Sequence, residues 1–241
     1  MLEFYRISVY NNCMNTTNIV KSIVALAAVA AVALSVNAAD NGSVPVTGSV
    51  GAKYANQNYY RGGDLGDETL SLSVGLDGKL GGVGVFGDVI SSQSIGTDFG
   101  DQYYISAGVA STLFENVNVT GGYLHTENEP GVSSGELFVT SSLDVVLSPS
   151  VGVNYNPDDE LLSYIVGVSH SVEVAELDVT GHACYGDTEL TSTTDRAYYL
   201  LGVSAGYGLT DTTDLTVAVD YVDPDDTDNE TIFSVGINVR F

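Results

Sequence analysis

Cationic side chains are scarce in this 241-residue chain, which has seven Lys and Arg against 31 Asp and Glu and a formal net charge of −24. A polyanionic partner would be repelled, and no basic stripe is present to offset that repulsion. The composition therefore predicts no nucleic-acid partner.

Tryptophan is absent, there are only five Pro, and few straight-chain helix formers follow residue 40, whereas Gly (27) and Tyr (15) are abundant. This mixture disfavours a helical bundle and favours many short strands. The hydrophobic content of 44% and the mean hydropathy of +0.15 argue against a disordered acidic chain. We expect one all-β domain with a real interior.

The beginning of the chain has the pattern of an export signal. After Met14 come a short polar stretch with Lys21 and an Ala/Val/Leu-rich run over 23–36, and small residues precede and include Ala38. A 14-residue apolar run is short for a transmembrane anchor, because the hydrocarbon core is about 30 Å thick. We interpret residues 1–38 as a signal peptide that starts at Met14 and is cleaved after Ala38, which leaves 39–241 as the exported domain.

Cysteine is also rare. Of the two cysteines, Cys13 lies within the predicted leader and Cys184 is left alone in the exported domain. The exported protein is therefore expected to have no disulfide.

Apolar residues recur at every second position from Val46 to the end of the chain, which indicates strands with one apolar and one polar face. The clearest case is the last run, where Phe233, Val235 and Ile237 alternate with Ser234 and Gly236. We count twelve strands, with ten as the alternative. They lie near 46–54, 70–76, 83–90, 103–111, 117–125, 137–147, 151–155, 162–170, 177–185, 199–207, 215–221 and 233–241.

Short and long connections alternate along the chain. The short ones fall near 77–79, 113–116, 148–150, 173–176 and 209–214, and the others near 55–68, 91–101, 126–135, 156–160, 186–195 and 223–230. Short turns at one end and long polar loops at the other are typical of a transmembrane antiparallel up-and-down β-barrel.

Aromatic residues support a barrel in lipid. Nine of them fall at strand ends next to the long loops and are predicted to form a girdle: Tyr54, Tyr103, Tyr123, Tyr155, Tyr164, Tyr185, Tyr199, Tyr221 and Phe233. The polar face is mostly Gly, Ser, Thr and Asn, so the apolar face is expected to face outer-membrane lipid. A secreted β-sandwich, recoverable without detergent, is the competing interpretation.

Two features resemble bacterial outer-membrane proteins. The last strand ends in Phe241, similar to the signal that the barrel assembly machinery recognises. The stretch Tyr59-Tyr60-Arg61-Gly62-Gly63, followed by the strand Leu70–Leu76, resembles the first outer loop of the TorF-type porin family, although this chain has no Trp and more acidic loops. The resemblance implies a porin-like role in the outer membrane of a Gram-negative-type cell, without naming a solute.

Strand parity places six charges toward the lumen: Lys53, Asp88, Asp144, Asp178, Asp220 and Arg240. The excess of acids predicts passage of small solutes with a preference for cations. Alternatively, these charges pair with one another and block the bore. Passive diffusion needs no cofactor.

An enzyme is not expected. Of the candidate bases, His125 shares the parity of a lipid-facing residue and His170 lies toward the periplasmic end of its strand. His182 projects inward beside Thr180 and Cys184, with Asp178 as the acid on the same face. A lone inward His is more often a hydrogen-bonding residue of the wall than a general base.

One outer loop is strongly acidic, with Asp223, Asp225, Asp226, Asp228 and Glu230 within eight positions. Carboxylates at this density suit a weak Ca²⁺ or Mg²⁺ site, but the spacing is not that of an EF-hand, and a solvated loop is the favoured interpretation. The long loops equally suit a structural protein, an adhesin or a receptor barrel.

Overall fold

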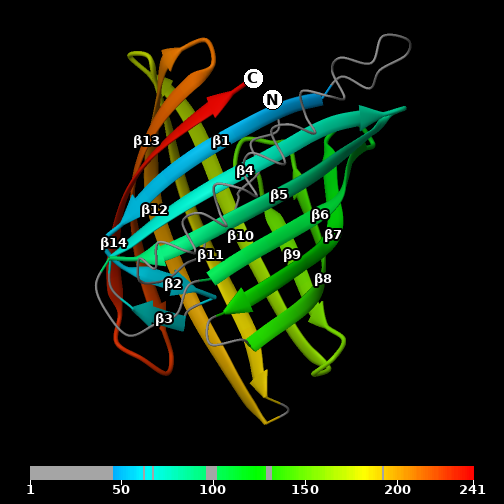
Figure 1. The fold of residues 1–241 in the computed structure, drawn as a ribbon, viewed down its shortest axis with the longest axis vertical. Helices are drawn as coiled ribbons and strands as arrows, with labels where there is room; N and C mark the ends of the chain where they lie inside the picture. The colour runs from blue at the N-terminus through cyan, green and yellow to red at the C-terminus, as the bar shows by residue number, and fades with distance from the viewer. Residues whose placement is uncertain (1–45, 62, 67, 96–101, 129–131, 192) are drawn as a thin grey trace.

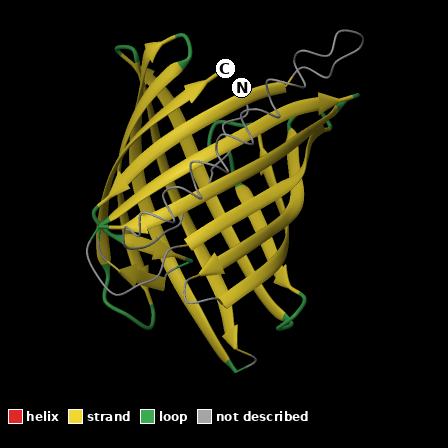
Figure 2. Ribbon diagram, viewed as in Figure 1, coloured by secondary structure: helices red, strands yellow, loops and turns green. Residues whose placement is uncertain are grey.

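The wall of the molecule is one closed antiparallel sheet of twelve strands (Figures 1 and 2), seen in a computed structural model that describes residues 46–61, 63–66, 68–95, 102–128, 132–191 and 193–241. The expected all-β barrel with twelve strands is confirmed. The predicted signal peptide lies outside the described residues. The strands of the wall are β1 (Val46–Ala55), β4 (Thr69–Leu80), β5 (Val83–Ser94), β6 (Gln102–Leu113), β7 (Val117–Asn128), β8 (Val132–Leu143), β9 (Ser150–Asn156), β10 (Leu161–Val174), β11 (Leu177–Thr191), β12 (Thr194–Thr210), β13 (Thr213–Pro224) and β14 (Glu230–Arg240).

No helix that is long and apolar enough to cross a membrane occurs among the described residues.

The ring closes where the first and last strands meet. Strand β1 pairs with β4 on one side and with β14 on the other. At one end of this seam, Gly48 and Phe241 exchange main-chain hydrogen bonds of 2.8 and 2.9 Å. At the other end, the Asn56 N–H donates to the Phe233 carbonyl (3.0 Å), and Asn56 Oδ1 accepts from the Phe233 N–H (2.5 Å). No strand edge of the ring is left open, as a lipid environment requires.

The register separates two faces, because residues paired across antiparallel strands point to the same side. Val217 pairs with Val235, and Tyr54 pairs with Val235 from the other side. On this outer face many apolar side chains are half exposed, for example Leu201 at 62% and Val217 at 48%. An apolar face turned outward excludes the sandwich interpretation, in which such side chains would form the core.

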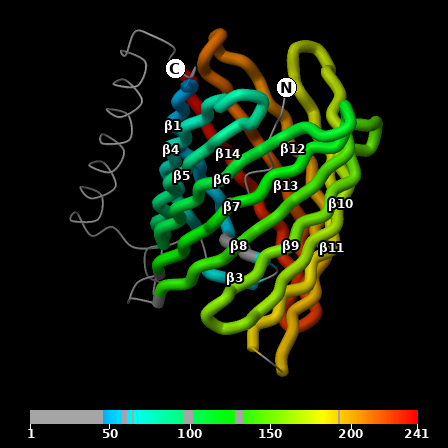
Figure 3. Tube along the Cα trace, turned by 90° about the vertical axis from the view of Figure 1, so that its right-hand side faces the viewer, coloured from blue at the N-terminus to red at the C-terminus, as the bar shows by residue number. Residues whose placement is uncertain are grey.

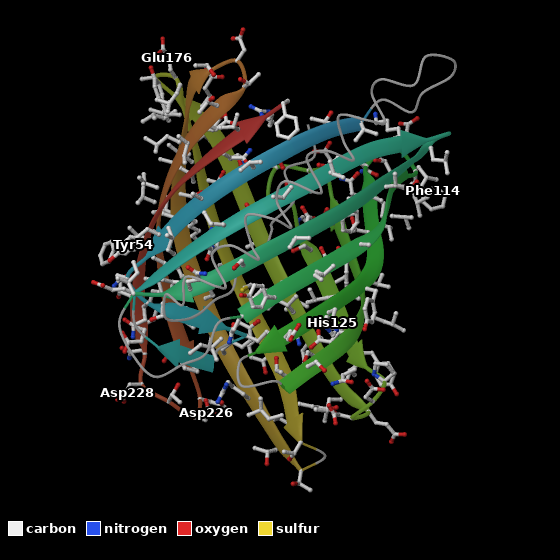
Figure 4. The ribbon with its side chains drawn as sticks, in the orientation of Figure 1. Tyr54, Phe114, His125, Glu176, Asp226 and Asp228 are labelled. Carbon is white, nitrogen blue, oxygen red and sulfur yellow. The ribbon has the colours of Figure 1, made fainter. Side chains whose placement is uncertain are left out.

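The two ends of the barrel differ. The turns 81–82, 114–116, 144–149, 175–176 and 211–212 lie at the end where β1 begins and β14 finishes, here called the turn end. Figure 4 shows Phe114 and Glu176 at the turn end, and Asp226 and Asp228 at the opposite, loop end. The 175–176 turn needs no glycine, although Ala175 and Glu176 both have positive φ values, of 49° and 71°, as a two-residue hairpin turn requires.

Several predicted loops are shorter than expected. Strands β11 and β12 continue through most of 186–195, and β7 and β8 extend into 126–135. Polar residues on both faces suggest a loop in the sequence, but Thr188 and Arg196 still pair across the hairpin. Main-chain pairing continues in water beyond the apolar band, because it does not require an apolar face.

A second, two-stranded sheet forms inside the predicted loop 55–68. It consists of β2 (Asn58–Tyr60) and β3 (Gly63–Gly66), which pair with each other and not with the wall. In both Figure 1 and Figure 3, the two strands lie within the outline of the barrel near its loop end. This hairpin carries Arg61, whose side chain reaches the wall.

Candidate functional site

The register places five of the six predicted lumen charges on the inner face: Lys53, Asp88, Asp178, Asp220 and Arg240. Asp144 is the exception. Strand β8 ends at Leu143, so Asp144 lies exposed in the following turn, where its N–H donates to the Asn116 carbonyl (2.8 Å). The strand ends earlier than the apolar pattern over 137–147 indicates, so the position of Asp144 in the lumen stays a prediction.

The inward histidine has an acidic partner that sequence spacing did not reveal. His182 Nε2 lies 2.9 Å from Asp220 Oδ1, and both side chains are largely buried. His182 is on β11 and Asp220 on β13, so the contact crosses the intervening strand β12. It crosses at Gly202, where an added Cβ would collide with both side chains. A wall residue in contact with a carboxylate from another strand is the role that this geometry supports.

A second charged pair joins the β2–β3 hairpin to the wall. The Arg61 guanidinium makes a two-pronged contact with the Glu136 carboxylate of β8, with Nη1 3.0 Å from Oε1 and Nη2 bound to Oε2. Arg61 Nη1 also donates to Ser163 Oγ of β10 (3.4 Å). Two-pronged arginine–carboxylate contacts fix orientation as well as distance.

Apolar groups fill part of the loop end of the lumen. Leu65 of the hairpin packs against Tyr104, together with Ile90 and Leu124 from the neighbouring strands. A second cluster consists of Ala55, Val222 and Ile232, with Leu200 packed against it. The expectation of a lumen lined mostly by Gly, Ser, Thr and Asn is therefore wrong at this end, where large side chains interrupt the polar pattern.

Two aromatic rings also lie on the inner face. Phe86 and Phe138 approach to 6.4 Å between ring centroids. They meet over Gly108 and Gly122, whose missing side chains leave room for the rings. Here the inner face has two glycines without side chains, and the two phenylalanine rings that cover them keep it apolar.

The arginines among the described residues all bind carboxylates. Besides Arg61, Arg240 Nη2 lies 2.7 Å from Asp214 Oδ2 near the turn end. Arg196 Nε contacts both carboxylate oxygens of Asp226 (2.8 Å each) at the loop end. Each of these three arginine charges is thus offset by a carboxylate, and most of the acidic residues in the chain have no basic counterpart.

The register places all nine predicted girdle residues on the outer face: Tyr54, Tyr103, Tyr123, Tyr155, Tyr164, Tyr185, Tyr199, Tyr221 and Phe233. Three of them touch, because Tyr185 lies 6.2 Å from Tyr164 and 5.2 Å from Tyr199 between ring centroids. Figure 4 shows Tyr54 projecting outward at the edge of the barrel.

The acidic loop does not assemble a cation site. Asp223 and Glu230 fall on opposite faces of the wall by register. Asp225 Oδ1 instead accepts from the Ala197 N–H (3.1 Å), and Asp226 binds Arg196. Within the described ranges, no group of three or more His, Cys, Asp or Glu residues is arranged to hold a metal ion.

The register also places the remaining candidate residues. His125 and His170 face outward by register, opposite Gly135 and Gly181. Cys184 faces inward, two positions from His182.

Sequence reasoning missed Arg61 and Glu136 as lumen residues. The outward parity of Leu137 and Val139 would have turned Glu136 inward, but Phe138, an aromatic on the inward face, obscured that pattern. Arg61 was noticed only as part of the motif that resembles other porins, and no local pattern shows that its loop folds inward.

A closed twelve-stranded antiparallel barrel with an apolar exterior and charged residues inside has the architecture of outer-membrane channels. No family model matches the chain, and no curated protein matches it either. The chain is similar in structure to a KdgM porin, with a TM-score of 0.54, 13% identity and coverage of 80% of this chain and 99% of the porin. It is also similar to the NanC porin (TM-score 0.54, 11% identity, 80% and 98% covered) and to the COG4313 outer membrane channel from Pseudomonas putida F1 (0.52, 11%, 84% and 100%).

These similarities show that the fold is shared with outer-membrane porins. Membership of the TorF-type family stays a prediction, because no family model matches this chain.

Proposed function

We propose that the protein is an outer-membrane pore through which small solutes and cations diffuse passively. The observation that carries this proposal is the closed wall whose apolar face is outside and whose inner face bears Asp88, Asp178 and Asp220. Carboxylates along a confined aqueous path attract cations and repel anions. Diffusion requires no bond chemistry, so the proposal assigns no catalytic role to the residues of the wall.

The surroundings of the pore are part of the same proposal. The outward aromatic residues would lie at the lipid headgroups, where amphipathic rings are favoured. Export would use the predicted signal peptide, and the barrel assembly machinery would recognise the last strand, which ends at Phe241. The main-chain contact between Phe241 and Gly48 supports a role for this residue in closing the ring.

Single-channel recording tests the proposal. The full gene product, exported by its own leader and extracted from the outer membrane in detergent, is inserted into a planar bilayer under a KCl gradient. We expect discrete conductance steps and a reversal potential on the cation-selective side. A folded, inserted barrel that never conducts would contradict the pore and would leave the outer loops, as a receptor or adhesin surface, to carry the function.

A matched pair of variants tests the lumen charge. Asp178 is exposed on the inner face of β11, whereas Glu176 lies two residues away at the tip of the preceding turn. Asp178→Asn should lower the cation-to-anion permeability ratio, and Glu176→Gln, which removes the same charge outside the bore, should change it less. Equal effects of the two variants would argue against selection by the lumen.

A further inference from the structure

The β2–β3 hairpin crosses the lumen from one wall to the opposite one. It follows β1, and its Arg61 contacts β8 and β10. Each of these strands is five positions from β1 in the twelve-strand ring, counted in opposite directions, so the contact straddles the strand that faces β1. Twelve strands about 4.8 Å apart and tilted by about 40° enclose a ring roughly 24 Å across. Figures 1 and 3 show the hairpin inside this ring.

Two buried contacts hold the hairpin in place. The Arg61 and Glu136 side chains are only 12% and 14% exposed, so water competes weakly for their two-pronged contact. Leu65 on β3 provides the second contact by packing on Tyr104, which is 6% exposed. Arg61 has a positive φ of 50°, which is uncommon for a residue other than glycine, and it projects from the tip of the hairpin.

Burial of the inner face changes along the barrel. Toward the loop end, inward residues such as Thr69, Ser92, Asn156, Ser163 and Thr188 are buried. Toward the turn end, the inward residues Thr112, Ser171, Asp178 and Thr216 are exposed. The hairpin and the two apolar clusters therefore narrow the half of the lumen that lies toward the loop end, while the inward residues of the other half stay exposed.

We propose that Arg61 and Glu136 form a latch that holds the β2–β3 hairpin across the lumen and thereby determines which solutes pass. This inference rests on the proposed pore function. With the latch closed, only small hydrated ions and solutes pass beside the hairpin. Release of Arg61 frees the tip of the hairpin from the wall opposite β1 and widens the path.

Charge-removing variants test the latch. Glu136→Gln keeps the length of the side chain, Arg61→Gln leaves a shorter polar one, and each removes one partner's charge, so each should raise single-channel conductance at least twofold. Each should also admit larger neutral sugars in liposome-swelling assays. Arg196→Gln is the matched control, because it removes the same positive charge at the same end of the barrel without touching the hairpin, and it should leave conductance near the wild-type value.

A reversible cross-link tests the same latch in the opposite direction. In a Cys184→Ser background, Arg61→Cys and Glu136→Cys are joined by a short bis-methanethiosulfonate reagent of about the reach of the original pair. Cross-linking should lower the conductance and the sugar-size limit below those of the same variant before reaction, and dithiothreitol should restore both. A monofunctional reagent of the same chemistry controls for added bulk, and heat-dependent mobility on gels confirms folding.

The outcomes separate the latch from the pore. If the wild type conducts and neither the charge variants nor the cross-link alters conductance or size limit, the latch is wrong and the pore stands. If the wild type, the charge variants and a variant with 58–66 replaced by a Gly-Ser linker are all folded and silent, the pore itself is wrong. Silence of the wild type with conduction by the linker variant and by Glu136→Gln would overturn the proposed passage of ions beside the latched hairpin, because the hairpin would then block the bore completely.

Discussion

Single glycines decide which lumen side chains can meet. His182 and Asp220 reach each other across β12 only because Gly202 has no side chain. We expect Gly202→Ala to separate the pair and lower the free energy of unfolding by about 1–3 kcal/mol, the usual cost of leaving a buried polar group without its partner. Urea unfolding in lipid vesicles, followed by tyrosine fluorescence, measures this difference.

Gly206 is the matched control for Gly202. It lies four positions along the same strand and on the same inner face, but an added Cβ there would meet its nearest atoms, which belong to Asp178, at an ordinary 3.8–3.9 Å. Gly206→Ala should therefore be close to neutral. If the two substitutions lower the free energy of unfolding equally, the effect comes from replacing a glycine and not from separating His182 and Asp220.

Neighbouring residues on one strand face different environments, lipid on the outer face and water in the lumen. Val217 points outward and is 48% exposed, whereas Thr216 points into the open half of the lumen. We expect Val217→Arg to lower the free energy of unfolding in lipid by about 2–4 kcal/mol, because the charge is placed in hydrocarbon. Thr216→Arg should fold normally and lower the cation preference in bilayer recordings. Two variants of equal stability would contradict the assignment of the faces.

At the scale of elements, the ring depends on the seam between its first and last strands. The Asn56 side chain extends the seam beyond β1, where it accepts from the Phe233 N–H and donates to the Thr231 carbonyl (3.5 Å). Asn56→Ala leaves the Phe233 N–H without this acceptor and should cost about 1–2 kcal/mol. Hydrogen exchange should rise selectively in β1 and β14.

Asn118→Ala is the control for the seam. Its side chain accepts from Thr112 (2.8 Å) within the β6–β7 hairpin, whose strands are joined by a short turn. Loss of this bond should not open the ring, so exchange in β1 and β14 should stay at the wild-type rate. Faster exchange at the seam in both variants would mean that Asn56 has no special role in closure.

The elements differ in how well the sequence predicts them. Strands that cross the apolar band follow from the alternation of residues such as Phe233, Val235 and Ile237, because lipid on one side imposes period two. Their extensions beyond the band were missed, since the pairing there depends on main-chain bonds. The latch was missed because Arg61 and Glu136 are 75 residues apart, and only the closed ring brings their strands face to face.

The lumen pairs show the same limit. Parity identified His182 and Asp220 as inward residues, but not as partners, because the contact crosses β12 and requires the strand order and the register of three strands. The end of β8 was misplaced for the opposite reason: the apolar run through Val145 and Leu147 continues into a turn. The local pattern thus predicts whether a strand residue points inward or outward, whereas contacts between inward residues depend on the strand order and register of the closed barrel.

At the scale of the whole molecule, a net charge of −24 predicts that ion preference depends on salt concentration. The Debye length is about 30 Å at 0.01 M salt and about 3 Å at 1 M, whereas a twelve-stranded ring has a radius of roughly 12 Å. At low salt the field of the carboxylates therefore spans the bore, and at high salt it is confined to the wall. The permeability ratio of K⁺ to Cl⁻, from reversal potentials at a fixed threefold gradient, should fall toward one as the mean concentration rises. A ratio that stays constant would mean that cations are selected by binding at a single lumen site. Salt screens such a direct contact far less than it screens the combined field of many carboxylates.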